Sequence, residues 1–325
     1  MPADRADKIR AVIAEDMLAV DQIIRRRLDS DVVLIRAIAE HIIGGGGKRL
    51  RPSMVLLAAG ACGYIGQQHR ELAAVVEFIH TATLLHDDVV DESELRRGRK
   101  TANAEFGNAA SVLVGDFLYS RAFQMMVTTG NLRVLEVLAY ATNTIAEGEV
   151  LQLLNTHNAS ISEPEYLAVI RQKTAKLFEA AAQLGAIVAG VPESLVVCLG
   201  RYGMHIGTAF QLIDDVLDYS GDAASTGKNL GDDLNEGKPT LPLIYVLQNG
   251  SPEQVQIVHE AIEHGGRTGF SQVMEAINAT GALVYAKAAA VQEAAESKRA
   301  IALLPDSKYK ESLIELASFA VERDH

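Results

Sequence analysis

Residues 195–219 read LVVCLGRYGMHIGTAFQLIDDVLDY, and this stretch decides the fold of the chain. It has the length of a long helix and carries apolar residues around most of its circumference. A helix that is apolar on nearly every side belongs in the buried centre of a large helical assembly. Residues 73–85, AAVVEFIHTATLL, have the same character. Two such segments predict a helical bundle built around them.

Helix signals extend outward from these segments in both directions. Ala, Leu, Glu, Gln and Arg are abundant, whereas alternating β-branched runs between hairpin turns are scarce. Pro52 opens an apolar run, and Ser162-Glu-Pro-Glu165 and Ser251-Pro-Glu-Gln254 have the pattern of capping boxes. We expect helices near 5–28, 31–43, 52–62, 71–92, 109–129, 131–156, 163–189, 193–219, 239–248, 252–264 and 282–303.

The chain is expected to form one all-α domain over residues 1–325, a single large helical bundle with a central apolar cavity. Its length alone would allow about two domains. No linker-like shift in composition divides it, however, and no internal repeat is visible. The segment from Ser220 to Lys238 is rich in glycine and charge and lacks apolar periodicity. A long loop of this kind in a compact domain is usually a binding loop or lid.

The overall composition excludes several classes of function. Of the 325 residues, 48% are hydrophobic, and 42 acidic residues against 30 basic ones give a net charge of −12. Such a chain lacks the positive electrostatic field that attracts nucleic acids and anionic membranes. No nucleic-acid partner and no stable membrane insertion are therefore expected. Its two cysteines, Cys62 and Cys198, form no C-x-x-C pair. The charged first residues contain no apolar signal-peptide region, which predicts a cytoplasmic protein.

A first acidic motif, His86-Asp-Asp-Val-Val-Asp-Glu92, follows the apolar segment 73–85. Asp87 and Asp91 lie four residues apart and therefore on one helix face, with Asp88 beside them. Three carboxylates at the negative end of a helix dipole are locally unfavourable. For this motif alone, a solvated helix end and a divalent-cation site both remain open.

A second acidic motif, Asp214-Asp-Val-Leu-Asp218, repeats the same spacing at the end of the other apolar segment. Two such motifs on two buried helices are hard to explain as solvated helix faces. Carboxylates without nitrogen or sulfur ligands suit Mg²⁺, which is commonly shared with substrate phosphates. Facing each other across a bundle, the two motifs would form a clamp for a diphosphate and several metal ions.

Basic residues cluster at matching places in the sequence. Gly44-Gly-Gly-Gly-Lys-Arg-Leu-Arg-Pro52 is not a Walker A loop, because Ile42 and Arg49 stand where that motif needs Gly and Ser or Thr. It remains a basic turn before a helix N-terminus, which favours an anion. Arg96 and Arg97 follow the first acidic motif, and guanidinium groups match phosphate oxygens. Pairing of these arginines with nearby acids is the alternative. Further candidates for contact with the substrate or its phosphates are His80, Lys173-Thr174, Lys228 and Lys238.

Together, the basic turn, the two acidic motifs, Arg96-Arg-Gly98 and Gln211 resemble the trans-type polyprenyl diphosphate synthases along nearly the whole chain. Within that family the bacterial octaprenyl-forming members are the most similar, as seen in Ala109-Ala-Ser-Val-Leu-Val-Gly-Asp-Phe-Leu118 and Gly231-Asp-Asp-Leu-Asn-Glu-Gly-Lys-Pro-Thr-Leu-Pro242. The resemblance implies an all-α fold of the isoprenoid synthase type and a homodimer.

The resemblance also implies roles for individual residues. Metal bound to an allylic diphosphate would be held by Asp87, Asp88, Asp91, Asp214, Asp215 and Asp218. That diphosphate would also contact Arg96, Lys173, Lys228 and Lys238, and the diphosphate of isopentenyl diphosphate would contact Lys48, Arg51, His80 and Arg97. Thr174 and Gln211 would lie near the developing allylic cation.

The implied reaction adds isopentenyl diphosphate units to farnesyl or another allylic diphosphate, with about three Mg²⁺ ions around the diphosphate. The expected product is a long all-trans polyprenyl diphosphate, octaprenyl for a quinone side chain, and lengths from heptaprenyl to decaprenyl remain open. Transient membrane contact at product release is expected.

Product length is expected to depend on the helix before Asp87. Family members with short products carry aromatic residues four or five positions before this aspartate, where Thr83 and Ala82 stand here. These small side chains would let the product continue past Ile79 and Val76. Phe123, Met125 and Met126 are candidates for the tunnel floor, with ordinary core packing as the alternative.

Three other interpretations compete. A terpene cyclase or head-to-head prenyl synthase would use acidic helices but has no need for Lys48 and Arg51 as a second diphosphate site. A non-catalytic helical partner subunit or lipid-binding protein would not need both acidic motifs together with the arginines. A shorter-chain synthase would share every motif and differ only in product.

Overall fold

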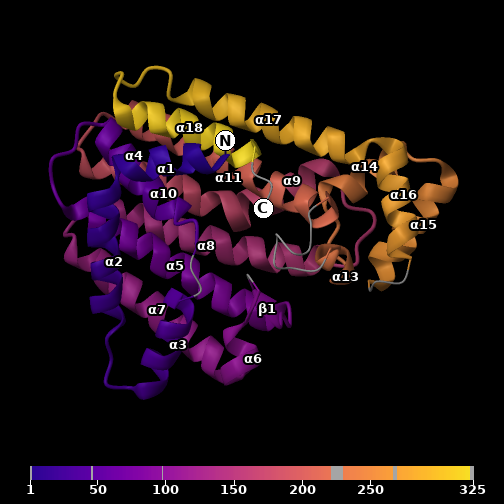
Figure 1. Ribbon diagram of the computed structural model, residues 1–325, viewed down its shortest axis with the longest axis horizontal. Helices are drawn as coiled ribbons and strands as arrows, with labels where there is room; N and C mark the ends of the chain where they lie inside the picture. Colours follow the sequence, from indigo (N-terminus) through magenta and orange to yellow (C-terminus); the bar gives the residue numbers. More distant parts are fainter. Residues whose placement is uncertain (1, 45–46, 97, 221–229, 266–268, 323–325) are drawn as a thin grey trace. The chain divides into compact units, whose positions relative to one another are not determined.

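Nearly all of the regular structure is α-helical in the computed structural model, which describes residues 2–44, 47–96, 98–220, 230–265 and 269–322 (Figure 1). Within these ranges the only strands are β1 (Leu95–Arg96) and β2 (Arg99–Lys100). They form a short antiparallel hairpin in which Leu95 pairs with Lys100 and Arg96 with Arg99. The predicted all-α fold is confirmed.

The chain divides into two compact units. Unit 1 comprises Met1–Thr142, Leu177–Gly203 and Ala300–Leu316, and unit 2 comprises Asn143–Lys176, Met204–Arg299 and Ala317–His325. Several of the boundaries between them fall within helices rather than in linkers. None of the described helices has both the length and the apolar character needed to cross a bilayer.

Unit 1 is organised around α5 (Gln68–Val90), which packs along α7 (Asn108–Thr128) and against α4 (Leu50–Ala61) and α2 (Ala14–Leu28) (Figure 1). Its other elements are the hairpin, α1 (Pro2–Val12), α3 (Val33–Gly44), α6 (Ala102–Phe106), most of α10 (Lys176–Val188), and the first parts of α8 (Leu132–Asn155), α11 (Glu193–Ser220) and α18 (Lys308–Glu322).

The core of unit 1 explains why two of its helices are apolar on most sides. Residues 52–59 of α4 are all buried, as are residues 72–76 of α5. Burial of one Val, Leu or Ile side chain contributes about 1.5–3 kcal/mol, so these runs stabilise the centre of the unit. Gly185 of α10 allows a close approach to α4, because a Cβ there would lie 2.6 Å from the Ala59 nitrogen.

Two clusters of buried apolar residues lie in the described part of unit 2. One joins Tyr219 and Leu234 to the short helices near residues 243–282, and the other joins Tyr166 and Ile170 to Leu212, Ile213 and Val216. The elements that lie wholly within this unit are α9 (Glu163–Ile170), η1 (Arg171–Ala175), α13 (Asp232–Asn235), α14 (Leu241–Asn249), α15 (Pro252–His264) and α16 (Phe270–Thr280), and α17 (Ala282–Ala300) lies in it except for its last residue.

Most predicted helices are present, with three differences. The range 5–28 is wrong as one helix, because the chain turns at the buried Ile13, whose amide bonds to Arg10 in a tighter turn. The range 163–189 is interrupted by the wider π-helical turn η1. Helices α16 and α18, and the short helices α6 and α13, lie where no predicted range fell. Both capping boxes, at Ser162 and Ser251, are confirmed.

Candidate active site

The first acidic motif lies at the C-terminal end of α5 in unit 1. Asp87 and Asp91 are partly exposed, whereas Asp88 is only 4% exposed. Asp91 caps the helix, and its amide bonds to the carbonyl of Asp87. Adjacent helical residues point about 100° apart, so Asp88 faces away from the side that Asp87 and Asp91 share. The motif therefore presents two carboxylates on one face and one on another.

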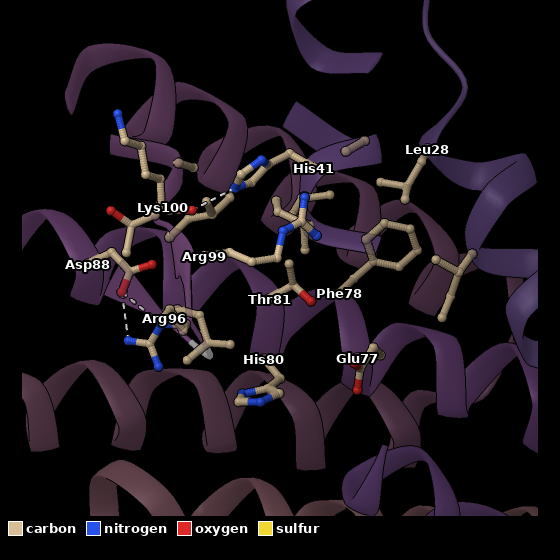
Figure 2. A pocket seen from close by; sticks show the side chains of 18 of the residues that line it. Leu28, His41, Glu77, Phe78, His80, Thr81, Asp88, Arg96, Arg99 and Lys100 are labelled. Atoms are coloured by element: carbon tan, nitrogen blue, oxygen red, sulfur yellow. Dashed lines mark hydrogen bonds and ion pairs between the residues drawn. The ribbon is translucent and has the colours of Figure 1, made fainter. Parts of the chain in front are cut away.

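Asp88 pairs with Arg96 of the β1–β2 hairpin. The Nε and Nη2 atoms of Arg96 donate to Asp88 Oδ1 at 2.8 and 2.6 Å (Figure 2). Asn103 Nδ2 donates to the carbonyls of Asp88 and Ser93, which fixes the chain leading into the hairpin. The pairing of an arginine with a nearby acid, which the sequence left open, is thus present for Arg96.

A pocket in unit 1 adjoins this pair (Figure 2). One face of α5 contributes Glu77, Phe78, Thr81, Leu85 and Asp88, and the other walls come from α2, α3, α7 and the segment from the hairpin into α6. The wall is apolar toward α2, mixed toward α3, where His41 lies between Ala39 and Ile42, and basic toward the hairpin. Its basic and histidine side chains are His41, Arg49, His80, Arg96, Arg99 and Lys100.

Two of the residues predicted to hold isopentenyl diphosphate contact each other. Arg51 Nη1 lies 3.2 Å from His80 Nε2, and the Arg51 guanidinium lies 4.3 Å above the ring of Phe178. A cation over an aromatic face is attracted to it, and Phe178 is fully buried. Lys48 is partly buried beside α4, and Arg97 lies outside the described residues. Phe178 as a support for Arg51 was missed by the sequence reasoning.

Arg49 has a role that the sequence did not indicate. It adopts a left-handed backbone conformation (φ 51°) just before α4, and its side chain forms an ion pair with Glu77 of α5. A non-glycine residue rarely takes this conformation. The turn therefore directs Arg49 to Glu77 and Arg51 to His80, three residues further along the same helix.

The second acidic motif lies near the C-terminal end of α11 in unit 2. Asp215 is 2% exposed, while Asp214 and Asp218 are partly exposed. Asp218 Oδ2 accepts a hydrogen bond from the Asp233 amide at 3.2 Å, which ties α13 to the end of α11. As in the first motif, the middle aspartate is the buried one.

Asp215 is held by two neutral donors. Gln211 Nε2 donates to Oδ1 at 2.8 Å, and the Tyr166 hydroxyl donates to Oδ2. Burial, together with the negative charge of Asp233, raises the pKa of Asp215 to about 7, although both hydrogen bonds oppose that rise. Burial also raises the pKa of the Tyr166 hydroxyl well above its usual value.

Lys173 and Thr174 lie in the π-helical turn η1. Such turns are rare and often occur at functional sites. Lys173 Nζ lies 2.6 Å from Glu149 Oε2 of α8, and Thr174 Oγ1 donates to Gln211 Oε1 at 3.0 Å. Gly148 of α8 allows this approach, because a Cβ there would lie 2.6 Å from the Lys173 nitrogen. The structure thus brings together the predicted Thr174, Gln211 and Asp215.

Lys238 follows a turn whose geometry is set by His157. The His157 amide donates to the carbonyl of Gly237 at 2.8 Å, and its Nδ1 lies 3.0 Å from the carbonyl of Ile262. Lys238 Nζ lies 2.5 Å from Glu236 Oε2. Lys228 belongs to a segment outside the described residues.

The residues predicted to govern product length lie along α5. Val76, Ile79 and Ala82 are fully buried, and Thr83 donates from Oγ1 to the carbonyl of His80. None of these four is among the residues lining the pocket of Figure 2, so the face on which we expect the product differs from the pocket face. On α7, Met125 and Met126 are fully buried, and Phe123 is 39% exposed.

The aspartates have the oxygen donors that suit Mg²⁺, but they do not form a complete cage. Among the described residues, no group of three His, Cys, Asp or Glu side chains is arranged to hold a metal ion alone. Mg²⁺ usually keeps several waters and binds one or two carboxylates together with substrate phosphates. The pair Asp87 and Asp91 and the pair Asp214 and Asp218 fit that mode, in which a diphosphate completes the coordination.

Comparison with known proteins identifies the family. A family model described as polyprenyl synthetase matches residues 32–300. The chain belongs to the polyprenyl synthetase family. It is 55% identical to an octaprenyl diphosphate synthase of Escherichia coli over 319 residues, which cover 98% of this chain and 99% of that protein. The predicted family and the predicted prenyltransferase class are confirmed.

Two further relatives show how far the similarity extends. A Rhodobacter capsulatus protein named all-trans-nonaprenyl-diphosphate synthase is 47% identical, with 99% of each chain covered. The crystal structure of a polyprenyl synthase from Caulobacter crescentus, complexed with calcium and isoprenyl diphosphate, superposes with a TM-score of 0.95. That protein is 46% identical, with 98% of each chain covered. The isoprenoid synthase fold is therefore confirmed along nearly the whole chain.

Proposed function

We propose that the enzyme adds successive isopentenyl diphosphate units to farnesyl or another allylic diphosphate and makes an all-trans octaprenyl diphosphate for a quinone side chain. The identity to an octaprenyl diphosphate synthase supports this product. The 47% identity to a nonaprenyl synthase leaves the neighbouring lengths as outcomes of the test. Residues 1–325 would act as one functional domain.

One observation carries the proposal: two acidic motifs with the same spacing lie at the ends of two largely buried helices, and basic side chains lie in the same unit as each motif. Asp88 of the first motif pairs with Arg96, and Asp214 and Asp218 lie on α11 in the same unit as Lys173 and Lys238. Solvated helix ends would not need such neighbours.

In the proposed reaction the C–O bond of the allylic diphosphate breaks, and the diphosphate leaves with the electron pair. Arg96, Lys173 and Lys238 would bind its oxygens and stabilise the growing charge. The double bond of isopentenyl diphosphate then forms a C–C bond to the allylic cation, and the released diphosphate takes the proton that is lost. Apolar walls would exclude water, which would otherwise quench the cation.

The chain's own dipoles would support the cation. Thr174 donates to Gln211, so the hydroxyl and amide oxygens of this pair are held together. Oxygen dipoles fixed in advance beside a developing positive charge lower the barrier without reorganisation. Arg51 and His80 would hold isopentenyl diphosphate with Lys48 and Arg97, and Phe178 would steady Arg51. Lys228 is proposed to bind the allylic diphosphate.

Bound Mg²⁺, about three ions in the proposed complex, would neutralise the charge of the leaving diphosphate. Asp87, Asp91, Asp214 and Asp218 would hold these ions from the exposed faces of the motifs. The buried Asp88 and Asp215 would bind metal from the inner side. Metal binding should therefore depend on a diphosphate, because the aspartates alone form no complete site.

We further propose that the enzyme is a homodimer and that it contacts a membrane only transiently, when the product leaves. Helix α7 carries exposed apolar residues on one face, Val112, Leu113, Phe123 and Val127. A stripe of this kind is a candidate for contact with a second copy. A cytoplasmic location remains a prediction, which cell fractionation tests.

The decisive experiment incubates the purified enzyme with farnesyl diphosphate, labelled isopentenyl diphosphate and Mg²⁺, followed by chromatography of the chain lengths. Octaprenyl diphosphate is the expected product. A uniform heptaprenyl, nonaprenyl or decaprenyl product would overturn the octaprenyl assignment, and a short product would make the enzyme a shorter-chain synthase. No incorporation would support a non-catalytic partner subunit or lipid-binding protein.

A further inference from the structure

The Tyr166 hydroxyl ends a chain of hydrogen bonds through the predicted allylic site. Thr174 Oγ1 donates to Gln211 Oε1 at 3.0 Å, and Gln211 Nε2 donates to Asp215 Oδ1 at 2.8 Å. Tyr166 donates to the other carboxylate oxygen, Oδ2. The amide of Gln211 and the carboxylate of Asp215 are thus each held at both ends. No sequence motif pointed to Tyr166.

Tyr166 is itself rigidly placed. It lies one turn into α9, whose start is fixed by the Ser162–Glu165 capping box. The residue is only 4% exposed and belongs to a cluster with Ile170, Leu212 and Val216. A buried ring with a fixed backbone leaves its hydroxyl little freedom, so the hydroxyl is a fixed donor to Asp215.

We propose that Tyr166 is a positioning residue for the second acidic motif. By holding Oδ2 it would keep the Asp215 carboxylate directed at Gln211, and it would keep Asp214, the next residue, directed at the metal and the diphosphate. Partners that orient metal-binding carboxylates typically affect metal affinity or activity by about 10- to 100-fold when removed. This inference rests on the proposed function.

Loss of the hydroxyl would affect Gln211 as well. The oxygen and the NH₂ group of a side-chain amide have nearly the same shape, and hydrogen bonds decide which of the two faces a given partner. A carboxylate freed at Oδ2 would turn and hold Nε2 less firmly. The amide could then flip and present hydrogen-bond donors, rather than an oxygen, toward Thr174 and the allylic cation. Such a flip would lower kcat.

The test compares Tyr166→Phe with Tyr202→Phe. Tyr202 is also fully buried, but its hydroxyl donates to the carbonyl of Leu313 at 2.7 Å in unit 1. Both variants lose one buried hydrogen bond, which removes the general effect on stability from the comparison. Isothermal titration of Mg²⁺ into enzyme with inorganic diphosphate should show about 10-fold weaker binding for Tyr166→Phe only. The kcat with farnesyl diphosphate should fall in parallel.

Equal Mg²⁺ affinities for the two variants, with an active wild-type enzyme, would overturn the inference and leave the proposed function intact. An inactive wild type would instead overturn the proposed function. Asp215→Asn provides a second background. If Tyr166 acts through Asp215, adding Tyr166→Phe to Asp215→Asn should change Mg²⁺ affinity little, whereas a further 10-fold loss would contradict this route. If Tyr166→Phe alone fails to fold, the comparison of the double variant with Asp215→Asn still tests the proposal.

Discussion

Arg96 directs both Nε and Nη2 at one oxygen of the buried Asp88, at 2.8 and 2.6 Å. The hairpin is thereby fastened to the end of α5. Removal of Arg96 would leave a buried carboxylate without its charged partner, which is more costly than the pair itself is stabilising.

Arg96→Met should therefore lower the free energy of unfolding by about 2 kcal/mol in urea titrations. Arg99→Met is the matched control, because Arg99 is the cross-strand neighbour of Arg96 and is exposed. The double variant Arg96→Met/Asp88→Asn should recover part of the loss. Equal stabilities of the two single variants would contradict a structural role of the pair.

Gly148→Ala should destabilise the enzyme, although Ala normally favours a helix interior by about 0.5–1 kcal/mol over Gly. The added Cβ would lie 2.6 Å from the Lys173 nitrogen and 2.9 Å from Gln172 Cβ, so η1 must move away from α8. Because η1 holds Lys173 and Thr174, activity should fall at least as strongly as stability.

Val150→Ala is the control for this change, since Val150 is 57% exposed on the same helix. Thermal melting and the initial rate of isopentenyl diphosphate incorporation measure the two effects. A Gly148→Ala enzyme that is as stable and active as this control would show that α8 and η1 tolerate separation.

The stability of unit 2 should depend on pH through Glu293. Burial tends to raise the pKa of Glu293, but the hydrogen bonds and charges of His205 and Arg171 outweigh burial and lower it below its usual 4.5. A carboxylate with a depressed pKa contributes stability that is present above the unfolded pKa. That contribution is lost as pH falls through the lower folded pKa.

Glu293→Gln should therefore reduce the free energy of unfolding at pH 7, and the difference from wild type should shrink below about pH 4.5. Glu296→Gln removes an exposed pair with Arg299 on the same helix and should have little effect at any pH. Urea titrations at several pH values provide the comparison. A difference for Glu293→Gln that grows toward low pH has the wrong sign and would refute this account.

Much of the fold could be predicted because apolar pattern and helix packing agree in this chain. The wholly apolar faces of residues 195–219 and 73–85 indicated α11 and α5, and local capping signals indicated α9 and α15. The turn at Ile13 and the π-helical turn η1 could not be predicted, because each depends on packing between distant segments rather than on local pattern.

The active site, like the fold, could be predicted from the sequence only in part. Spacing alone put Asp87 and Asp91 on one face with Asp88 beside them, whereas the structure shows Asp88 turned inward and only 4% exposed. The partners of the buried aspartates, Arg96 for Asp88 and Tyr166 for Asp215, follow from tertiary contacts eight and 49 residues away in sequence. The sequence offered Arg96 as a phosphate ligand and gave no sign of Tyr166, because an isolated tyrosine on a helix is most often only core.

Ala82→Phe should shorten the product, because Ala82 is fully buried on the α5 face where we expect the growing chain. Thr81→Phe is the neighbouring control, since Thr81 lines the pocket on the other face (Figure 2). Product length does not depend on rate, so chromatography separates blockage from simple loss of activity. An unchanged product with Ala82→Phe would show that this face does not line the tunnel.

Leu113→Glu combined with Val127→Glu should convert the proposed dimer into monomers. Both side chains are about two-thirds exposed, at 66% and 64%, and they lie on the same face of α7. Two carboxylates on each copy would face their counterparts and repel, and the apolar contact would be lost. Light scattering after size-exclusion chromatography measures the mass. Leu303→Glu, at a site 84% exposed outside this stripe, should leave the mass unchanged. If the wild type is already monomeric, or if the double variant keeps the mass of a dimer, another surface or none joins the copies.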